Sequence, residues 1–259
     1  MPVPLNASLA VLRQHLGHGL VASVLFAAGL GTSIPVVRRN VRVLMAVPLW
    51  IVRQVLRVIG PKFPPLRVFL LIFCFNTIAI FLYMLSGVLI VLPAAIAFLT
   101  GVNIGVIVLK AGEVELPSGE RPLAAALAHP EHLEVAPWVS LCSLAVLVLE
   151  LPSFWISVGM GIGMGRALSS PGMYTWEQIR LLVIPRATAY WTIIVPALFV
   201  SALAETAAIR GHLTARARAE EEGQGEGQAP PDTPPHERAG ETDDESPPPD
   251  EGGAEDDEG

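Results

Sequence analysis

Long apolar runs without charge dominate the chain, and each is long enough to cross a lipid bilayer. A spanning helix needs about 20 apolar residues, because roughly 30 Å of hydrocarbon is crossed at about 1.5 Å per residue. The run 68–109 has about twice that length, and Ser86-Gly87 and Pro93 offer a break, so we predict two spans joined by a short turn. The pattern predicts an all-α, polytopic membrane protein with about five transmembrane helices, at 14–37, 68–91, 93–109, 135–165 and 179–204.

The segment 38–62 is also apolar, but it is basic, and we expect it to behave differently. Its arginines fall within an arc of about 100° when a helix turns by about 100° per residue. A basic stripe on an apolar helix favours a position in the membrane interface over a crossing, with a kink at Pro48. A sixth span whose arginines line a cavity is the alternative. The arginines are Arg38, Arg39, Arg42, Arg53 and Arg57.

Charge is divided sharply along the chain. Residues 219–259 hold 16 acidic side chains and one basic one, a formal charge of −15, whereas residues 1–218 hold 16 basic and 8 acidic ones, giving +8. The acidic segment has too little apolar surface to offset chain entropy, so we expect a disordered, solubilising tail, with recruitment of a basic partner as the alternative. The long uncharged runs exclude a soluble globular domain, and the scattered cations argue against nucleic-acid binding.

Basic residues between the spans predict the orientation, because cytoplasmic loops are enriched in Lys and Arg. With five spans, 12 cations lie on the side of 38–67, 110–136 and 205–218, and 4 lie on the other side. We therefore expect a multi-pass protein of the cell membrane with an external N-terminus and a cytoplasmic C-terminus. Three parts are predicted: an N-terminal span with the basic helix (1–67), a membrane-embedded core (68–206) and a cytoplasmic tail (207–259).

Few polar side chains interrupt the predicted spans, and these are the candidate functional residues. Glu150 stands two residues before Pro152, and a carboxylate near a bilayer centre costs about 2.5–3.5 kcal/mol, so it is normally protonated, paired or facing a cavity. Pro152 frees a backbone carbonyl nearby, and broken helices of this kind occur at binding sites. Both a functional Glu150 and one that only joins two helices stay open. Glu205 ends the last span, where an interfacial cap is favoured, and Asn76 and Asn103 are expected mainly to bridge helices.

Four alternating glycines follow Glu150 and form two overlapping small-xxx-small patterns, which let another helix approach at backbone distance: Gly159, Gly161, Gly163 and Gly165. Histidines and cysteines offer no comparable pattern. Two histidine pairs lack further ligands, and both cysteines lie within apolar spans, so we expect no metal site, cofactor or disulfide. These residues are His15, His18, His129, His132, Cys74 and Cys142. No catalytic set is recognisable, and we expect a protein that is not an enzyme.

Together these features resemble the stage II sporulation protein M family of integral membrane proteins. The resemblance covers about residues 68–206. It rests on F-C-F-N-T-I-A around Asn76, G-V-N-I-G around Asn103, L-E-L-P-S at 149–153, G-M-G-I-G-M-G-R-A-L ending at 168, and S-A-L-A-E-T ending at 206. The chain departs from the family at Ala145-Val146-Leu147, where members often have Pro-His-Gly, so no role of that histidine is implied here.

The resemblance implies a membrane-embedded component of a complex, since the sporulation members work with peptidoglycan-degrading proteins. The expected partners are then the lipid bilayer and other membrane proteins, cell-envelope hydrolases among them, and no nucleic acid. Two hypotheses of function follow. The first is a non-enzymatic scaffold, suggested by a glycine-rich packing surface without a catalytic set. The second is a transporter or permease subunit with its site around Glu150 and Pro152.

Overall fold

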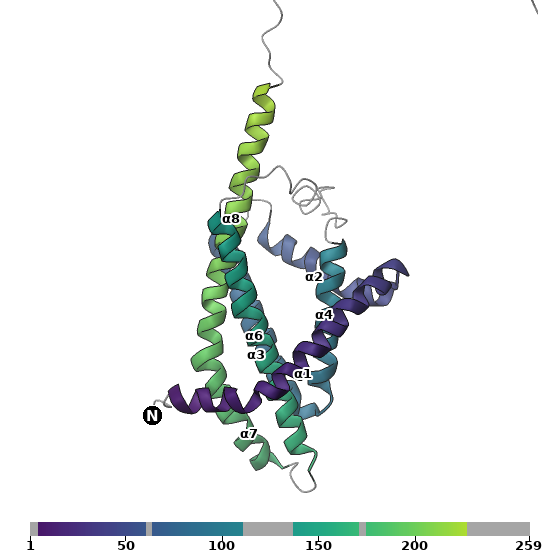
Figure 1. Ribbon diagram of the computed structural model, residues 1–259, viewed down its shortest axis with the longest axis vertical. Coiled ribbons are helices and arrows are strands. Elements are labelled where there is room, and N and C mark those ends of the chain that lie inside the picture. Colours follow the sequence, from purple (N-terminus) through teal and green to yellow (C-terminus); the bar gives the residue numbers. More distant parts are fainter. Residues whose placement is uncertain (1–4, 61–63, 111–136, 171–174, 227–259) are drawn as a thin grey trace, which may run out of the picture. The chain divides into compact units, whose positions relative to one another are not determined.

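The computed structural model describes residues 5–60, 64–110, 137–170 and 175–226, and all regular structure among them is helical. The acidic tail beyond residue 226 and the histidines His129 and His132 lie outside these residues. The elements, drawn in Figure 1, are α1 (Leu5–Arg38), α2 (Arg42–Ile59), α3 (Pro65–Leu85), the 3₁₀ helix η1 (Ser86–Leu89), α4 (Leu92–Lys110), α6 (Pro137–Leu168), α7 (Trp176–Ala189), the π-helical segment η4 (Tyr190–Ile194) and α8 (Val195–Glu226).

Five helical stretches are long and apolar enough to cross a membrane, which confirms the predicted fold class. Four of them lie where spans were predicted. The fifth, Trp176–Ala215, is longer than the predicted span 179–204, because α7, η4 and α8 follow one another without a loop. Helix α8 also enters the segment expected to be disordered from residue 219, where alanine and glutamate at 219–222 favour a helix.

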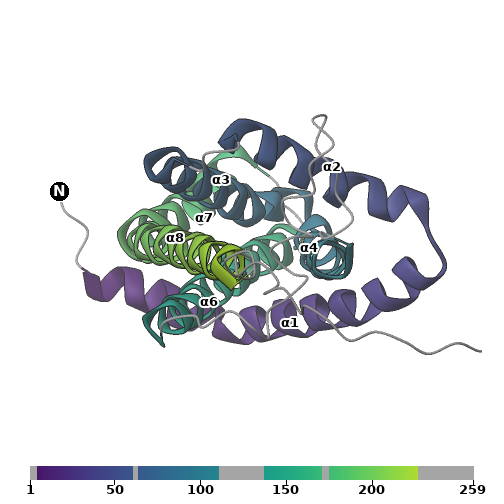
Figure 2. The ribbon, with the colours of Figure 1, turned by 90° about the horizontal axis from the view of Figure 1, so that it is seen from above.

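The basic segment forms a separate helix, α2, which is not among those five stretches. From above in Figure 2, α3, α4, α6 and α8 appear end-on whereas α2 lies lengthwise, so α2 runs across the direction of these helices. It buries Pro48, Leu56 and Ile59, and all five arginines of the segment 38–62 are exposed. This arrangement fits a helix that lies along a membrane surface, and its place in the interface stays a prediction.

Helix α1 packs into the predicted core and belongs to the same compact unit, Met1–Glu220. It runs obliquely past α4 and α6, its main neighbours (Figure 1). The close crossing of α1 and α4 depends on two glycines. Gly29 lies against the backbone of Phe98 on α4, and Gly101 lies against the backbone of Phe26 on α1. A side chain at either position would push the two helices apart.

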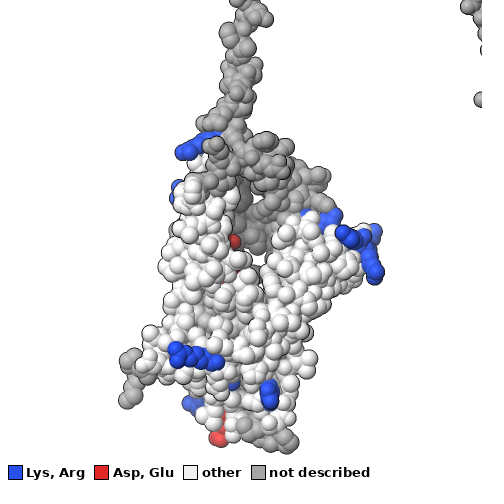
Figure 3. Space-filling model, viewed as in Figure 1, with Lys and Arg blue, Asp and Glu red and all other residues white. Residues whose placement is uncertain are grey.

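The charged side chains mark the two ends of the bundle. In Figure 3 the visible side of the helical bundle is almost entirely white, which means without charged residues, and the basic side chains gather towards its ends. The exposed Arg13, Arg166 and Arg180 belong to one predicted side, and the arginines of α2 belong to the other. An apolar belt with its charged side chains towards the ends fits a multi-pass membrane protein.

Labelling of single cysteines tests the orientation. After Cys74 and Cys142 are replaced by alanine, Ser170→Cys, which is exposed just beyond α6, is expected to react with a membrane-impermeant maleimide added to intact cells. Ser246→Cys is expected to react only after the cells are opened. Labelling of Ser246→Cys in intact cells would reverse the predicted orientation.

Candidate functional site

Glu150, near the middle of α6, makes a hydrogen bond to a different helix. The Asn76 amide on α3 donates from Nδ2 to Glu150 Oε1 at 2.6 Å, and both side chains are half-buried. The two residues are far apart in the sequence and were predicted separately from their polarity within apolar runs. A carboxyl group that accepts from an amide inside the bundle has the kind of partner that an intramembrane acid requires.

Helix α8 adds a hydroxyl and a second carboxyl group beside this pair. Ser201 lies next to Glu150. Its hydroxyl is buried, and its geometry towards the described residues falls short of a hydrogen bond. The Glu205 carboxyl group is close enough to Glu150 for their charges to interact. Because Ser201 and Glu205 are four residues apart, both project from one face of α8. We call Asn76, Glu150, Ser201 and Glu205 the carboxyl cluster.

Glu205 lies within a continuous helix. An interfacial cap was favoured because the predicted span ends at residue 204, and α8 continues without a break through Glu205 to Glu226. The Glu205 side chain is half-buried and interacts electrostatically with Glu150 of α6. Its place relative to the membrane boundary stays a prediction.

The carboxyl cluster is supported by a neighbouring hydrogen bond across helices. Tyr190, the first residue of the π-helical segment η4, is fully buried and its hydroxyl donates to the backbone carbonyl of Thr77. Thr77 follows Asn76 directly, so this bond fixes the turn of α3 that presents the amide. The Phe81 ring packs against the Tyr190 ring, with their centroids 5.1 Å apart, so an apolar side chain covers Tyr190 beside this hydrogen bond.

Pro152 does not break its helix, contrary to the expectation from the sequence. Helix α6 is continuous from Pro137 to Leu168. Pro152 lacks an N–H group, so the carbonyl of Val148 loses its usual helical donor. Ser153 Oγ donates to the next carbonyl, that of Leu149, at 2.6 Å. Glu150 thus stands on an unbroken helix.

Asn103 does not join the carboxyl cluster. It lies on α4, whose main neighbours are α1, α2 and α6, and no hydrogen bond links its side chain to the cluster within the described residues. The glycines on either side, Gly101 and Gly105, contact α1. Asn103, two residues from each glycine, points away from the face of α4 that contacts α1.

The alternating glycines of α6 pack against helices of the same chain. Gly159 lies against the backbone of Gly19 on α1, and Gly163 lies under the His15 ring. Gly161 contacts backbone carbonyls at the end of α3, and Gly165 contacts the turn at Ile90. The predicted close approach of another helix is therefore made within the chain.

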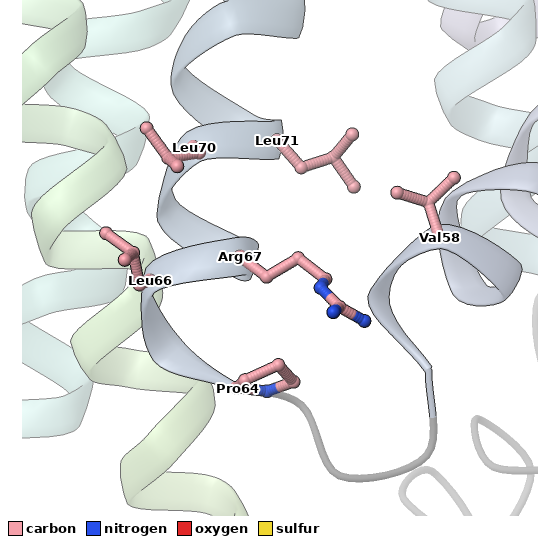
Figure 4. A pocket seen from close by; sticks show the side chains of 6 residues that line it. All are labelled: Val58, Pro64, Leu66, Arg67, Leu70 and Leu71. Carbon is pink, nitrogen blue, oxygen red and sulfur yellow. The ribbon is translucent and has the colours of Figure 1, made fainter.

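A cavity of about 570 Å³ opens elsewhere, between the end of α2 and the start of α3. In Figure 4, Arg67 and Leu71 extend from α3 towards Val58 of α2. The other lining residues are Pro64, Leu66 and Leu70. None of the predicted site residues lines this cavity, which is apolar apart from Arg67.

The carboxyl cluster offers oxygen atoms rather than a mixed set of metal ligands. No three His, Cys, Asp or Glu side chains gather in the described part of the chain. Two carboxyl groups, an amide and a hydroxyl suit a proton or a hard cation, which prefers oxygen ligands. Ser201 was missed from the sequence, although its spacing to Glu205 places both on one helix face.

Comparison with known proteins does not identify this site. No family model matches the chain, and no curated protein or solved structure matches it. The resemblance to the stage II sporulation protein M family stays a prediction.

Proposed function

We propose that the protein is a transporter or a permease subunit in which the carboxyl cluster binds a proton or a cation. One observation carries the proposal: Glu150 of α6 is hydrogen-bonded to Asn76 of α3, and Glu205 of α8 interacts electrostatically with this same acid within the helical bundle. Two carboxylates in such surroundings repel each other unless a proton or a cation neutralises part of their charge. Intramembrane acids of this kind mark ion and proton pathways.

The partners of the acids support binding rather than packing alone. Asn76 satisfies one oxygen of Glu150, while the hydroxyl of Ser201 is left without a fully formed hydrogen bond. A structural bridge between α3 and α6 would need only Asn76 and Glu150. Glu205 adds a second negative group that weakens such a bridge, and this cost is understandable if the site takes up a positive ligand.

The scaffold hypothesis keeps its support from the family resemblance. Its structural motivation is weaker, because the glycine-rich face of α6 already packs against α1, α3 and the turn at Ile90. Capture of stoichiometric membrane partners from mild detergent is the expected result if the protein is a scaffold.

Thermal unfolding of the purified full chain tests the transport proposal. Monovalent and divalent cations are compared with choline at equal ionic strength, so that screening of surface charge is the same in all samples. A cation that binds the cluster is expected to stabilise the wild-type protein by about 2.7 kcal/mol at a hundredfold excess over its dissociation constant. If the ligand is a proton, acidification stabilises instead.

Three variants distinguish the site from the rest of the chain. Glu150→Gln and Glu205→Gln are expected to lose the stabilisation, whereas Glu177→Gln, an exposed acid in the first turn of α7, keeps it. Identical responses of wild type and both cluster variants to every cation and to acidification would refute the proposal.

A further inference from the structure

A second polar group lies between α1, α6 and α7, away from the two acids. His15 and His18 of α1 and Arg186 of α7 form this basic cluster. His15 is 3% exposed and Arg186 is 8% exposed, while His18 is half-buried. A hydrogen bond about two turns away also joins α1 to the segment that follows α7, where Thr192 of η4 donates to Ser8 of α1 at 2.9 Å.

The basic cluster has donors that lack partners. The Nδ1 atoms of His15 and His18 and the Nε atom of Arg186 are buried without a hydrogen bond. Arg186 donates from Nη1 to the carbonyl of Leu182 at 2.6 Å, and no acidic side chain in the described part of the chain is paired with it. A guanidinium group buried without a negative partner is costly, so an anion from outside the chain would stabilise it.

The two imidazole rings meet over a glycine of α6. Their centroids are 5.8 Å apart, and a Cβ added to Gly163 would lie 2.6 Å from His15 Nδ1 and 3.5 Å from His18 Nδ1. A side chain at position 163 would therefore displace the His15 ring, whereas its distance to His18 would be an ordinary van der Waals contact. Because His18 is half-buried, the basic cluster is open on its side.

The basic cluster lies near one end of the bundle. Gly163 precedes the exposed Arg166 by three residues, about 4.5 Å along the helix, and the exposed Arg13 is two residues from His15. Such exposed arginines at a helix end lie at the level of lipid headgroups. An anionic group that reaches the basic cluster is therefore supplied most directly by a lipid.

We propose that the basic cluster binds the phosphate group of an anionic phospholipid. A phosphate accepts several hydrogen bonds at once, and the guanidinium fork and two imidazole N–H groups are donors suited to it. A metal ion is disfavoured, because Arg186 places a positive charge beside the two histidines. The site is separate from the carboxyl cluster and does not depend on the transport proposal.

Native mass spectrometry of the full chain, titrated with phosphatidylglycerol or phosphatidylcholine, tests this assignment. The wild-type protein is expected to bind phosphatidylglycerol more tightly. Arg186→Gln is expected to weaken that binding by roughly tenfold or more, because a charge-assisted hydrogen bond is lost. Arg180→Gln is the matched control, since Arg180 lies on the same helix and is exposed.

A milder variant covers the case in which Arg186→Gln does not fold. His18→Ala removes a half-buried ring and is expected to weaken binding of phosphatidylglycerol in the same direction, by a smaller factor. Equal affinity for the two lipids, unchanged binding in the folded variants, or an equal loss in Arg180→Gln would overturn the proposal. Displacement of phosphatidylglycerol by millimolar inorganic phosphate would assign the site to free phosphate and overturn the lipid assignment.

Discussion

Gly29→Ala is expected to lower the free energy of unfolding by about 3 kcal/mol, the upper end for overpacking a core. A Cβ at this position would overlap the carbonyl oxygen of Phe98 and lie 2.9 Å from its carbon. Both atoms belong to the backbone of α4, so no side chain can rotate away, and the extensive contact between α1 and α4 must open. The corresponding fall in Tm is roughly 6–12 °C for a chain of this size.

Gly31→Ala is the matched control for Gly29→Ala. Gly31 lies on the same helix, and a Cβ there would meet nothing within 4 Å. Alanine at this site is expected to leave stability unchanged or to raise it by about 0.5–1 kcal/mol, because glycine is unfavourable within a helix. Both variants are compared by thermal unfolding in one detergent; equal Tm values would show that the crossing is looser than described.

The partner glycine gives a further check on the crossing of α1 and α4. Gly101→Ala is expected to cost about as much as Gly29→Ala, because its Cβ would overlap the carbonyl oxygen of Phe26. The double variant is expected to cost less than the sum of the two, since the helices need to separate only once. Full additivity would indicate two independent contacts.

Glu150→Leu is expected to destabilise the protein by about 1–3 kcal/mol, because it leaves the Asn76 amide without its acceptor. Glu150→Gln is expected to change stability little, since its amide oxygen can accept the same hydrogen bond. Unfolding in mixed micelles measures both. A destabilisation in Glu150→Gln as large as in Glu150→Leu would show that the charge of Glu150, not its hydrogen bond, stabilises the bundle.

Asn76→Leu completes a double-mutant cycle with Glu150→Leu. The two single variants are expected to be destabilised to similar extents, and the double variant little more than either, because one hydrogen bond joins the residues. Activity then separates packing from function. Glu150→Gln with normal stability and normal activity in a complementation assay would remove the functional interpretation of Glu150.

The sequence was sufficient for the positions of most helices, because length and apolar composition set the spans. The turn between α3 and α4 was also predictable from Ser86-Gly87 and Pro93. The end of the last helix was not, since Glu205 was taken as a boundary although α8 continues to Glu226. A single acid inside a long helix looks the same in the sequence as an acid that ends one.

Neither polar cluster could be assembled from the sequence alone. Glu150, Asn76 and Glu205 were each conspicuous, but nothing in their spacing shows that α3, α6 and α8 meet at one point. His15 and Arg186 were harder still to recognise. His15 belonged to a histidine pair without further ligands, and Arg186 was one basic residue within the predicted span 179–204. The order in which helices pack is a property of three dimensions, and here it decides which polar residues become neighbours.

The π-helical segment η4 determines the direction in which Glu205 of the carboxyl cluster points relative to Arg186 of the basic cluster. Nineteen positions separate Arg186 from Glu205. In an uninterrupted α-helix, which turns by about 100° per residue, the two side chains would point about 100° apart. A π-helical turn takes up one additional residue, so it turns Glu205 back to nearly the same side as Arg186. A homologue that lacked one residue here would keep every helix and still point one cluster away from its partners.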